Sequence, residues 1–266
     1  MEINKYSNNP ILTKEKVPFK VNSIFNAGAV KFHNKYLLMC RVEMPNGRSS
    51  LVIAISEDGF NFVVDPKPTL TPEDHKEYYR YVDWGIEDAR ITKIENKFYL
   101  TYTGYSKYMP LVVLAETEDF NTFKIHGPIS EPSNKDCALF PEKIDGCYWK
   151  IDRPVADIRH DIWISSSPDL LHWGNYKILM EPLPGTWEND KIGSSSQLIK
   201  TKEGWLMLYH GVRSFGFSTI YKIGVVLLDL EKPWIVKGRT KDPILSPEID
   251  YERIGDVQNV VFACGW

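Results

Sequence analysis

The sequence predicts an all-β protein, a five-bladed β-propeller whose fifth blade is incomplete at the C-terminus. Two observations carry this prediction: short apolar runs separated by turn chemistry, and a residue signature that recurs along the chain. Dipeptides such as Asn46-Gly47 and Asp145-Gly146 favour tight connections between antiparallel strands, whereas helical periodicity is scarce. The pattern is therefore that of many short antiparallel strands.

The recurring signature consists of a small hydroxyl residue, an acid two positions later and an aromatic residue six positions after the hydroxyl. The hydroxyl and the acid can bond nearby backbone groups in a turn, while the aromatic packs back against the sheet. A recurrence every 50–60 residues is typical of propeller blades. A β-sandwich is the structural alternative, but it does not explain the recurrence. The three copies are Ser56-x-Asp58 with Phe62, Thr117-x-Asp119 with Phe123, and Ser167-x-Asp169 with Trp173.

Each copy closes a unit that begins with a hairpin, and the strand-like runs are expected in chain order. The first unit comprises Val30–Phe32, Tyr36–Cys40 and Leu51–Ile55, and the second comprises Ile91–Ile94, Phe98–Tyr102 and Leu111–Ala115. The third comprises Leu139–Ile144, Tyr148–Ile151 and Asp161–Ser165, and the fourth comprises Gln197–Ile199, Trp205–Tyr209 and Tyr221–Leu230, with Asp229 and Trp234 as a degenerate signature. The fifth begins at Asn259–Phe262 and is cut off at Trp266.

Composition narrows the class of protein. The 266 residues are expected to form one domain, 1–266, with a net charge of −3 and no basic footprint, so neither nucleic acid nor a membrane is expected as a partner. The four cysteines form no C-x-x-C pair and are interpreted as buried free thiols of a reducing compartment. Residues 1–5 contain no apolar signal segment, so a cytoplasmic location is expected. The oligomeric state, including a homo-oligomer, stays open.

The stretch Trp84–Ile91 is the strongest candidate for chemistry. It reads W-G-I-E-D-A-R-I and leads directly into a strand-like run, so Asp88 lies where a fold can hold a proton donor against a ligand. The structural alternative is that Asp88 and Arg90 only form an ion pair between a loop and a sheet.

Aligning the repeats by their second strands brings out a further pattern. Arg41, Arg153 and His210 occupy matching positions, and a radial fold would direct all three to one centre, which favours an anion site. Fifteen residues earlier the matching positions are Asn26, Asp88, Ala138 and Ser195.

These residues and several ordered motifs resemble the β-mannoside phosphorylases of glycoside hydrolase family 130. The resemblance covers nearly the whole chain and implies a five-bladed propeller that cleaves a β-mannosidic bond with inorganic phosphate, giving α-mannose 1-phosphate with inversion. The motifs include W-G-I-E-D-A-R-I, K-D-C-A-L-F-P-E-K at Lys135–Lys143, I-D-R-P at Ile151–Pro154, K-I-G at Lys191–Gly193, G-W-L-M-L-Y-H-G at Gly204–Gly211 and N-V-V-F-A-C-G at Asn259–Gly265.

The resemblance also implies roles for individual residues. Asp88 would be the catalytic general acid, acting through a sugar hydroxyl. Phosphate would be bound by Lys135, Arg153, Lys191, His210 and Tyr221. The mannosyl unit would be held by Asn26, Arg41 and Asp136, with Glu87 and Arg90 supporting the acid. No metal and no cofactor is expected besides phosphate as co-substrate, and the other partner would be a β-mannoside oligosaccharide.

The chemistry agrees with this interpretation. An inverting hydrolase needs a second carboxylate to activate water, whereas a phosphorylase uses an anionic nucleophile and needs cations instead. Two alternatives stay open: a β-mannosidase that uses water on the same scaffold, and a non-catalytic carbohydrate-binding propeller. The sequence decodes neither the linkage nor the acceptor sugar.

Overall fold

The computed structural model describes residues 3–155, 160–255 and 257–266, and its regular structure consists mostly of β-strands. The prediction of an all-β fold is confirmed. The helical elements of these residues are short: the 3-10 segments Lys14–Lys16 and Pro72–Tyr81 and one turn of α-helix, α1 (Asp250–Arg253). The segment Pro72–Tyr81, which begins with a capping box between Thr71 and Asp74, was not predicted from the sequence.

The chain divides into two compact units, mainly Lys5–Lys135 and Asp136–Ala263. The N-terminal unit holds β1 (Ser23–Phe32), β2 (Lys35–Glu43), β3 (Ser49–Ser56), β4 (Val63–Val64), β5 (Gly85–Ile94), β6 (Lys97–Tyr105), β7 (Leu111–Thr117) and β8 (Lys124–Pro128). The division falls inside β9 (Asn134–Leu139). The C-terminal unit continues with β10 (Tyr148–Pro154), β11 (Ile162–Ser167), β12 (Gly174–Met180), β13 (Lys191–Ser194), β14 (Ile199–Lys200), β15 (Trp205–Phe215), β16 (Ser218–Leu228) and β17 (Val236–Arg239).

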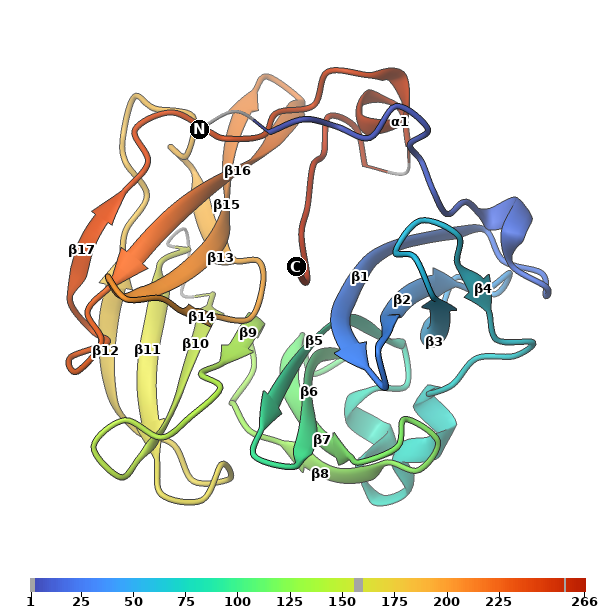
Figure 1. Ribbon diagram of the computed structural model, residues 1–266, viewed down its shortest axis with the longest axis horizontal. Helices are drawn as coiled ribbons and strands as arrows, with labels where there is room; N and C mark the ends of the chain where they lie inside the picture. The colour runs from blue at the N-terminus through green and yellow to red at the C-terminus, as the bar shows by residue number, and fades with distance from the viewer. Residues whose placement is uncertain (1–2, 156–159, 256) are drawn as a thin grey trace. The chain divides into compact units, whose positions relative to one another are not determined.

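Within the N-terminal unit, two antiparallel meanders are visible, β1-β2-β3-β4 and β5-β6-β7-β8 (Figure 1). They join through one parallel bridge, Ser49 to Gly85. Gly85 has φ of +141°, and a Cβ there would lie 2.8 Å from the Ser49 nitrogen. Glycine therefore permits the close approach of β3 and β5.

The C-terminal unit repeats the pattern. Its first sheet has the order β12-β11-β10-β9, and its second has the order β13-β15-β16-β17 with β14 beside β15 (Figure 1). Four successive antiparallel meanders therefore account for the described strands, as the four complete repeats in the sequence predicted.

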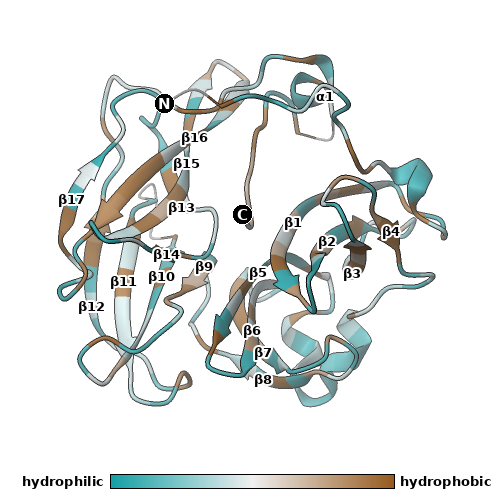
Figure 2. Cartoon of the chain, in the orientation of Figure 1, coloured by the Kyte–Doolittle hydropathy of each residue, from teal (hydrophilic) through white to brown (hydrophobic). Residues whose placement is uncertain are grey.

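Each unit has its own apolar core, because strand residues alternate between a packed face and an outer face. In the N-terminal unit the core includes Leu37, Ile91 and Leu100, and in the C-terminal unit it includes Trp205 and Met207. Apolar residues dominate much of β3 and β16, whereas most connections are hydrophilic (Figure 2).

The recurring signature forms the same turn in all three of its copies. The Ser56 hydroxyl donates to Asp58 Oδ1 at 2.8 Å, and the same oxygen accepts the backbone N–H groups of Phe60 and Asn61. In all three copies the residue three positions after the hydroxyl has a left-handed backbone, with φ of +78° at Gly59, +57° at Phe120 and +70° at Leu170. The side chains of Phe120 and Leu170 are buried.

We expect these turns to cost the protein stability in acid. Backbone N–H groups lower the pKa of the Asp58, Asp119 and Asp169 carboxyls. A carboxyl with a lower pKa in the folded state stabilises the fold above its unfolded pKa, and this stabilisation is lost as the pH falls through the folded pKa. The free energy of unfolding, measured by urea denaturation, should fall below about pH 4 and fall less steeply in Asp119→Asn. An equally steep fall in both proteins would contradict a role for this turn.

Three local predictions are wrong. Leu139–Ile144 was expected as a strand, but β9 ends at Leu139 and Pro141 follows, since proline cannot donate to a ladder. The fourth repeat begins with β13 and not with Gln197–Ile199 as expected, and of these three residues only Ile199 is in a strand. Asn259–Phe262 is not a strand: Val260 makes an isolated bridge to Tyr221.

The four cysteines are free thiols, as predicted, and three of them are buried. Burial raises the pKa of Cys40 to about 12. Cys147 is half-buried and lies in the connection before β10, not in a strand. Among the described residues, no helix is long and apolar enough to cross a membrane.

Candidate active site

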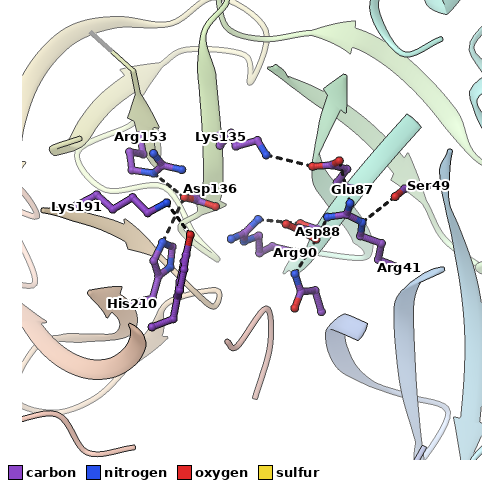
Figure 3. Close-up of polar contacts among 12 residues, drawn as sticks. Arg41, Ser49, Glu87, Asp88, Arg90, Lys135, Asp136, Arg153, Lys191 and His210 are labelled. Carbon is purple, nitrogen blue, oxygen red and sulfur yellow. Dashed lines mark hydrogen bonds and ion pairs between the residues drawn. The ribbon is translucent and has the colours of Figure 1, made fainter. Parts of the chain in front are cut away.

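The Asp88 carboxylate lies in a polar cluster of the N-terminal unit (Figure 3). Asp88 is 8% exposed, and its Oδ1 accepts hydrogen bonds from Asn26 Nδ2 at 3.0 Å and from Arg41 Nη1 at 3.2 Å. Arg41 is held in turn by Ser49, whose Oγ accepts from Nε at 2.8 Å. Strands β1, β2, β3 and β5 thus each contribute one of these four side chains. Both side-chain contacts of Asp88 fall on the same oxygen.

A β-bulge explains why Arg41 reaches two consecutive acids. In a regular strand, neighbouring side chains point to opposite faces. The ladder between β5 and β6 shifts register between Glu87 and Arg90, and Asp88 has φ of +54°. Arg41 Nη2 therefore binds Glu87 Oε1 at 3.0 Å while Nη1 binds Asp88.

Two further cations complete this cluster. Lys135 Nζ donates to Glu87 Oε2 at 3.1 Å. Arg90 is buried, and its Nη1 donates to the backbone oxygen of Asp88 at 2.8 Å (Figure 3). Arg90 therefore fixes the bulged backbone, while Lys135 and Arg41 share the Glu87 carboxylate. The charges of the two acids are balanced by nearby cations, which is what a buried carboxylate pair requires.

The second cluster belongs to the C-terminal unit and is centred on Asp136. Arg153 Nε donates to Asp136 Oδ2 at 2.7 Å, and His210 Nε2 lies 3.6 Å from the same oxygen (Figure 3). His210 is 1% exposed, and its Nδ1 is 3.3 Å from the Ser195 hydroxyl. Asp136 shares with Asp88 a left-handed backbone, with φ of +56°.

His160 extends this cluster. Its Nδ1 lies 3.1 Å from Arg153 Nη1. Burial lowers the pKa of His160, and the charges of Arg153 and Lys191 lower it further. A neutral imidazole beside a guanidinium accepts a hydrogen bond from it, so His160 orients Arg153 without adding a repelling charge.

Lys191 and Tyr221 form the other part of the cluster. Lys191 Nζ donates to the Tyr221 hydroxyl at 2.6 Å and lies 4.8 Å from its ring centroid. The Phe262 ring lies 4.6 Å from the His210 ring and 6.5 Å from the Tyr221 ring. The N-V-V-F segment thus packs against the polar cluster without being a strand.

The structure places every site residue that the sequence predicted in one of two groups. Asn26, Arg41, Glu87, Asp88, Arg90 and Lys135 lie together in the N-terminal unit, and Asp136, Arg153, Lys191, His210 and Tyr221 lie together in the C-terminal unit. Lys135, expected among the phosphate ligands, contacts Glu87. Asp136, expected to hold the mannosyl unit, contacts Arg153 and His210.

Three participants were not predicted: Ser49, His160 and Phe262. The motif N-V-V-F contains Phe262, but nothing in the motif assigns it a contact. His160 and Ser49 carry no local signal, because their role depends on strand pairing.

This all-β chain holds one buried acid among an amide and guanidinium groups and a second acid beside a further guanidinium group. Such groups are typical of enzymes that act on glycosidic bonds. Comparison with known proteins makes this specific. A family model described as beta-1,4-mannooligosaccharide phosphorylase matches residues 2–266. The chain belongs to glycoside hydrolase family 130.

Individual relatives are also similar to this chain. A beta-1,2-mannobiose phosphorylase of Thermoanaerobacter sp. is 41% identical over 99% of the chain and 89% of its own length. A beta-1,2-mannobiose phosphorylase of Listeria innocua is 42% identical over 82% of the chain, and this match spans only 59% of that relative. A solved complex of the beta-1,2-mannobiose phosphorylase from Listeria innocua with beta-1,2-mannobiose has a TM-score of 0.88 and 34% identity, covering 98% of this chain and 88% of that one.

Proposed function

We propose that this protein is a phosphorylase that cleaves a β-mannosidic bond with inorganic phosphate and releases α-mannose 1-phosphate with inversion. The observation that carries the proposal is the group of Arg153, Lys191, His210 and Tyr221, in which two cations lie with an imidazole ring and a phenolic hydroxyl. Names of relatives at 41–42% identity support phosphorolysis and favour a β-1,2 linkage.

The chemistry of an inverting reaction explains why such a cluster matters. A hydrolase activates water with a carboxylate base opposite its acid. In the C-terminal unit, Asp136 Oδ2 instead accepts a hydrogen bond from Arg153 Nε at 2.7 Å, so this carboxylate oxygen is already occupied by an ion pair. Phosphate needs no base, since it is already anionic, and charge-assisted hydrogen bonds from cations can hold it.

The roles follow from the contacts. A phosphate oxygen attacks the anomeric carbon, the glycosidic bond breaks, and the proton of Asp88 passes to the leaving oxygen. Asn26 and Arg41 orient Asp88 and the mannosyl unit, and Glu87 and Arg90 hold them in place. The assignment of Lys135 to phosphate and of Asp136 to mannose rests on the resemblance alone. No cofactor other than phosphate is proposed.

We also propose that residues 1–266 act as one catalytic domain with a five-bladed propeller architecture. Its support is the four consecutive antiparallel meanders and their repeated closing turns. A crystal structure in which the meanders form two stacked sheets would contradict the proposal.

The function is tested by incubating β-1,2- and β-1,4-mannobiose with the protein, with and without phosphate. Proton and phosphorus NMR should detect α-mannose 1-phosphate only when phosphate is present. Rates that are independent of phosphate from zero to saturation would identify a β-mannosidase instead. Binding of mannosides without turnover in either condition would identify a carbohydrate-binding protein.

Gly193 gives a test of the phosphate cluster. A Cβ at this position would lie 2.5 Å from Asp136 Oδ2 and 2.5 Å from His210 Cε1, so one of these side chains must move in Gly193→Ala. We expect the dissociation constant for phosphate, measured by calorimetry, to rise by roughly tenfold or more, the worth of one charge-assisted hydrogen bond. Gly238→Ala is the matched control, because nothing lies within 4 Å of its added Cβ. Unchanged phosphate affinity in Gly193→Ala would remove phosphate from this cluster.

A further inference from the structure

Aromatic residues gather at the end of the β5–β6 hairpin in the N-terminal unit. The rings of Trp84 and Tyr105 meet edge to face with centroids 5.5 Å apart, and the rings of Tyr81 and Tyr108 have centroids 5.7 Å apart. All four come from two short segments, 81–84 and 105–108, and we refer to them as the aromatic ledge. Arg80 lies over both Tyr81 and Tyr108, at 5.4 and 4.9 Å from the ring centroids.

The ledge leaves much of its apolar surface in solvent. Trp84 is 48% exposed, and Tyr81, Tyr105 and Tyr108 are half-buried. Tyr81 packs with one face against the apolar core of this unit, whereas Trp84 is among the exposed large apolar side chains. A partly exposed indole beside three half-buried tyrosine rings leaves apolar area that a ligand can cover.

The ledge is continuous with the acid cluster. Tyr105 pairs with Gly85 and Thr103 pairs with Glu87, so the side chains of Tyr105 and Glu87 share one face of the sheet. Two residues along a strand span about 7 Å, which is comparable to the length of one hexose unit. Lys135 connects the two positions: its Nζ lies 3.1 Å from Glu87 Oε2 and 5.9 Å from the centroid of the Tyr105 ring.

The direction of the ledge separates it from the mannosyl-binding residues. Asn26 and Arg41 contact Asp88 from β1 and β2. The ledge instead adjoins Glu87 and Lys135, at the open end of the β5–β6 hairpin, where Gly85 pairs with Tyr105. Pyranose rings present an apolar face of C–H groups that packs on aromatic rings, while their hydroxyls bond to carboxylates and ammonium groups. Glu87, Lys135 and Tyr105 together offer these two kinds of contact.

We infer that Trp84 and Tyr105 stack against the acceptor side of the oligosaccharide, beyond the bond that is cleaved, and that Tyr81 and Tyr108 extend this surface for longer chains. The ligand class is a neutral mannooligosaccharide. Identifying this side as the acceptor side rests on the proposed function, whereas binding of the oligosaccharide to the ledge does not depend on turnover.

Binding is therefore measured without catalysis, in an Asp88→Asn background, by calorimetry with β-mannobiose and β-mannotetraose of both linkages. Trp84→Ala should weaken binding of the tetraose and of the disaccharide by about tenfold each, the effect of removing one stacked aromatic ring, because both ligands place a sugar at the first acceptor position. Trp84→Phe should restore most of the loss. Tyr108→Ala should affect the tetraose alone.

Phe60→Ala is the matched control, since Phe60 is 45% exposed and pairs with the Tyr6 ring at 4.5 Å, beyond the other end of β3. It should leave both affinities unchanged. Equal tetraose affinity in Trp84→Ala and its parent would overturn the inference. A loss in Trp84→Ala that comes with a lower melting temperature and is not restored by Trp84→Phe would also overturn it, because it would show a purely structural role. Chain-length-dependent binding in a protein that shows no phosphorolysis would leave the ledge intact and reject only the proposed function.

Discussion

Replacing Asp88 with asparagine is expected to leave the protein folded and to lower its turnover by about 10²–10⁴-fold, the usual contribution of a general acid. The amide keeps the size of the side chain and can still accept the hydrogen bonds from Asn26 and Arg41 at Oδ1. Asparagine also tolerates the left-handed backbone at this position, where φ is +54°. What the variant lacks is an acidic proton to give to the leaving oxygen.

The measurement is kcat for phosphorolysis of mannobiose, alongside the melting temperature. Glu57→Gln is the control, because it makes the same chemical change at an exposed surface ion pair with Lys35. It should match the wild type in both quantities. Turnover close to that of the wild type in Asp88→Asn would return Asp88 to the role of a structural ion-pair residue.

Arg153→Ala is expected to raise the KM for phosphate by about ten- to a hundredfold, and the KM for the mannoside far less. The substitution removes a buried guanidinium that binds Asp136 and faces His160. Hydrogen bonds to charged groups contribute about 1.5–3 kcal/mol each, which corresponds to this range of affinity. Initial rates at saturating mannoside over a series of phosphate concentrations give the value.

Lys222→Ala is a suitable control for this variant. Lys222 follows Tyr221 on β16, so its side chain points to the opposite face of the strand. A change of similar size in Lys222→Ala would indicate a general effect of net charge. An unchanged phosphate requirement in Arg153→Ala would exclude this side chain from the anion site.

The parts of the structure that the sequence predicted well are those that depend on local chemistry. The closing turns needed only a hydroxyl, an acid and the backbone between them, and their hydrogen bonds are formed within six residues. The strand runs around Leu51 and Ile91 were likewise visible as apolar, β-branched stretches. Sequence alone could not supply the segment Pro72–Tyr81, because its buried His75 is fixed by the distant Tyr102 hydroxyl at 2.8 Å.

The sequence alignment of the repeats failed at one informative place. It matched Ala138 to Asn26 and Asp88, but the residue with a left-handed backbone in the third repeat is Asp136. The reason is the length of the hairpin: β1 and β5 turn into the next strand through two residues, whereas residues 140–147 separate β9 from β10. Counting back fifteen residues from Arg153 therefore stops at Ala138, two residues short of the acid. The family resemblance recovered Asp136 because it relied on the motif instead of the count.

The left-handed positions in β1, β5 and β9, the first strands of three repeats, have a consequence for the evolution of this fold. Asn26, Asp88 and Asp136 have φ of +49°, +54° and +56°. A left-handed conformation admits glycine, asparagine and aspartate far more readily than bulky side chains, so these sites accept few residue types. The permitted types nevertheless span a neutral amide, a carboxylate and no side chain at all. One nucleotide change is enough to exchange aspartate for asparagine. The exchange replaces a carboxyl group, which can donate a proton, with an amide that only forms hydrogen bonds, and it leaves the backbone undisturbed. The repeated strands therefore place three structurally equivalent backbone positions in the protein, and one of them can change its side chain while the other two keep theirs.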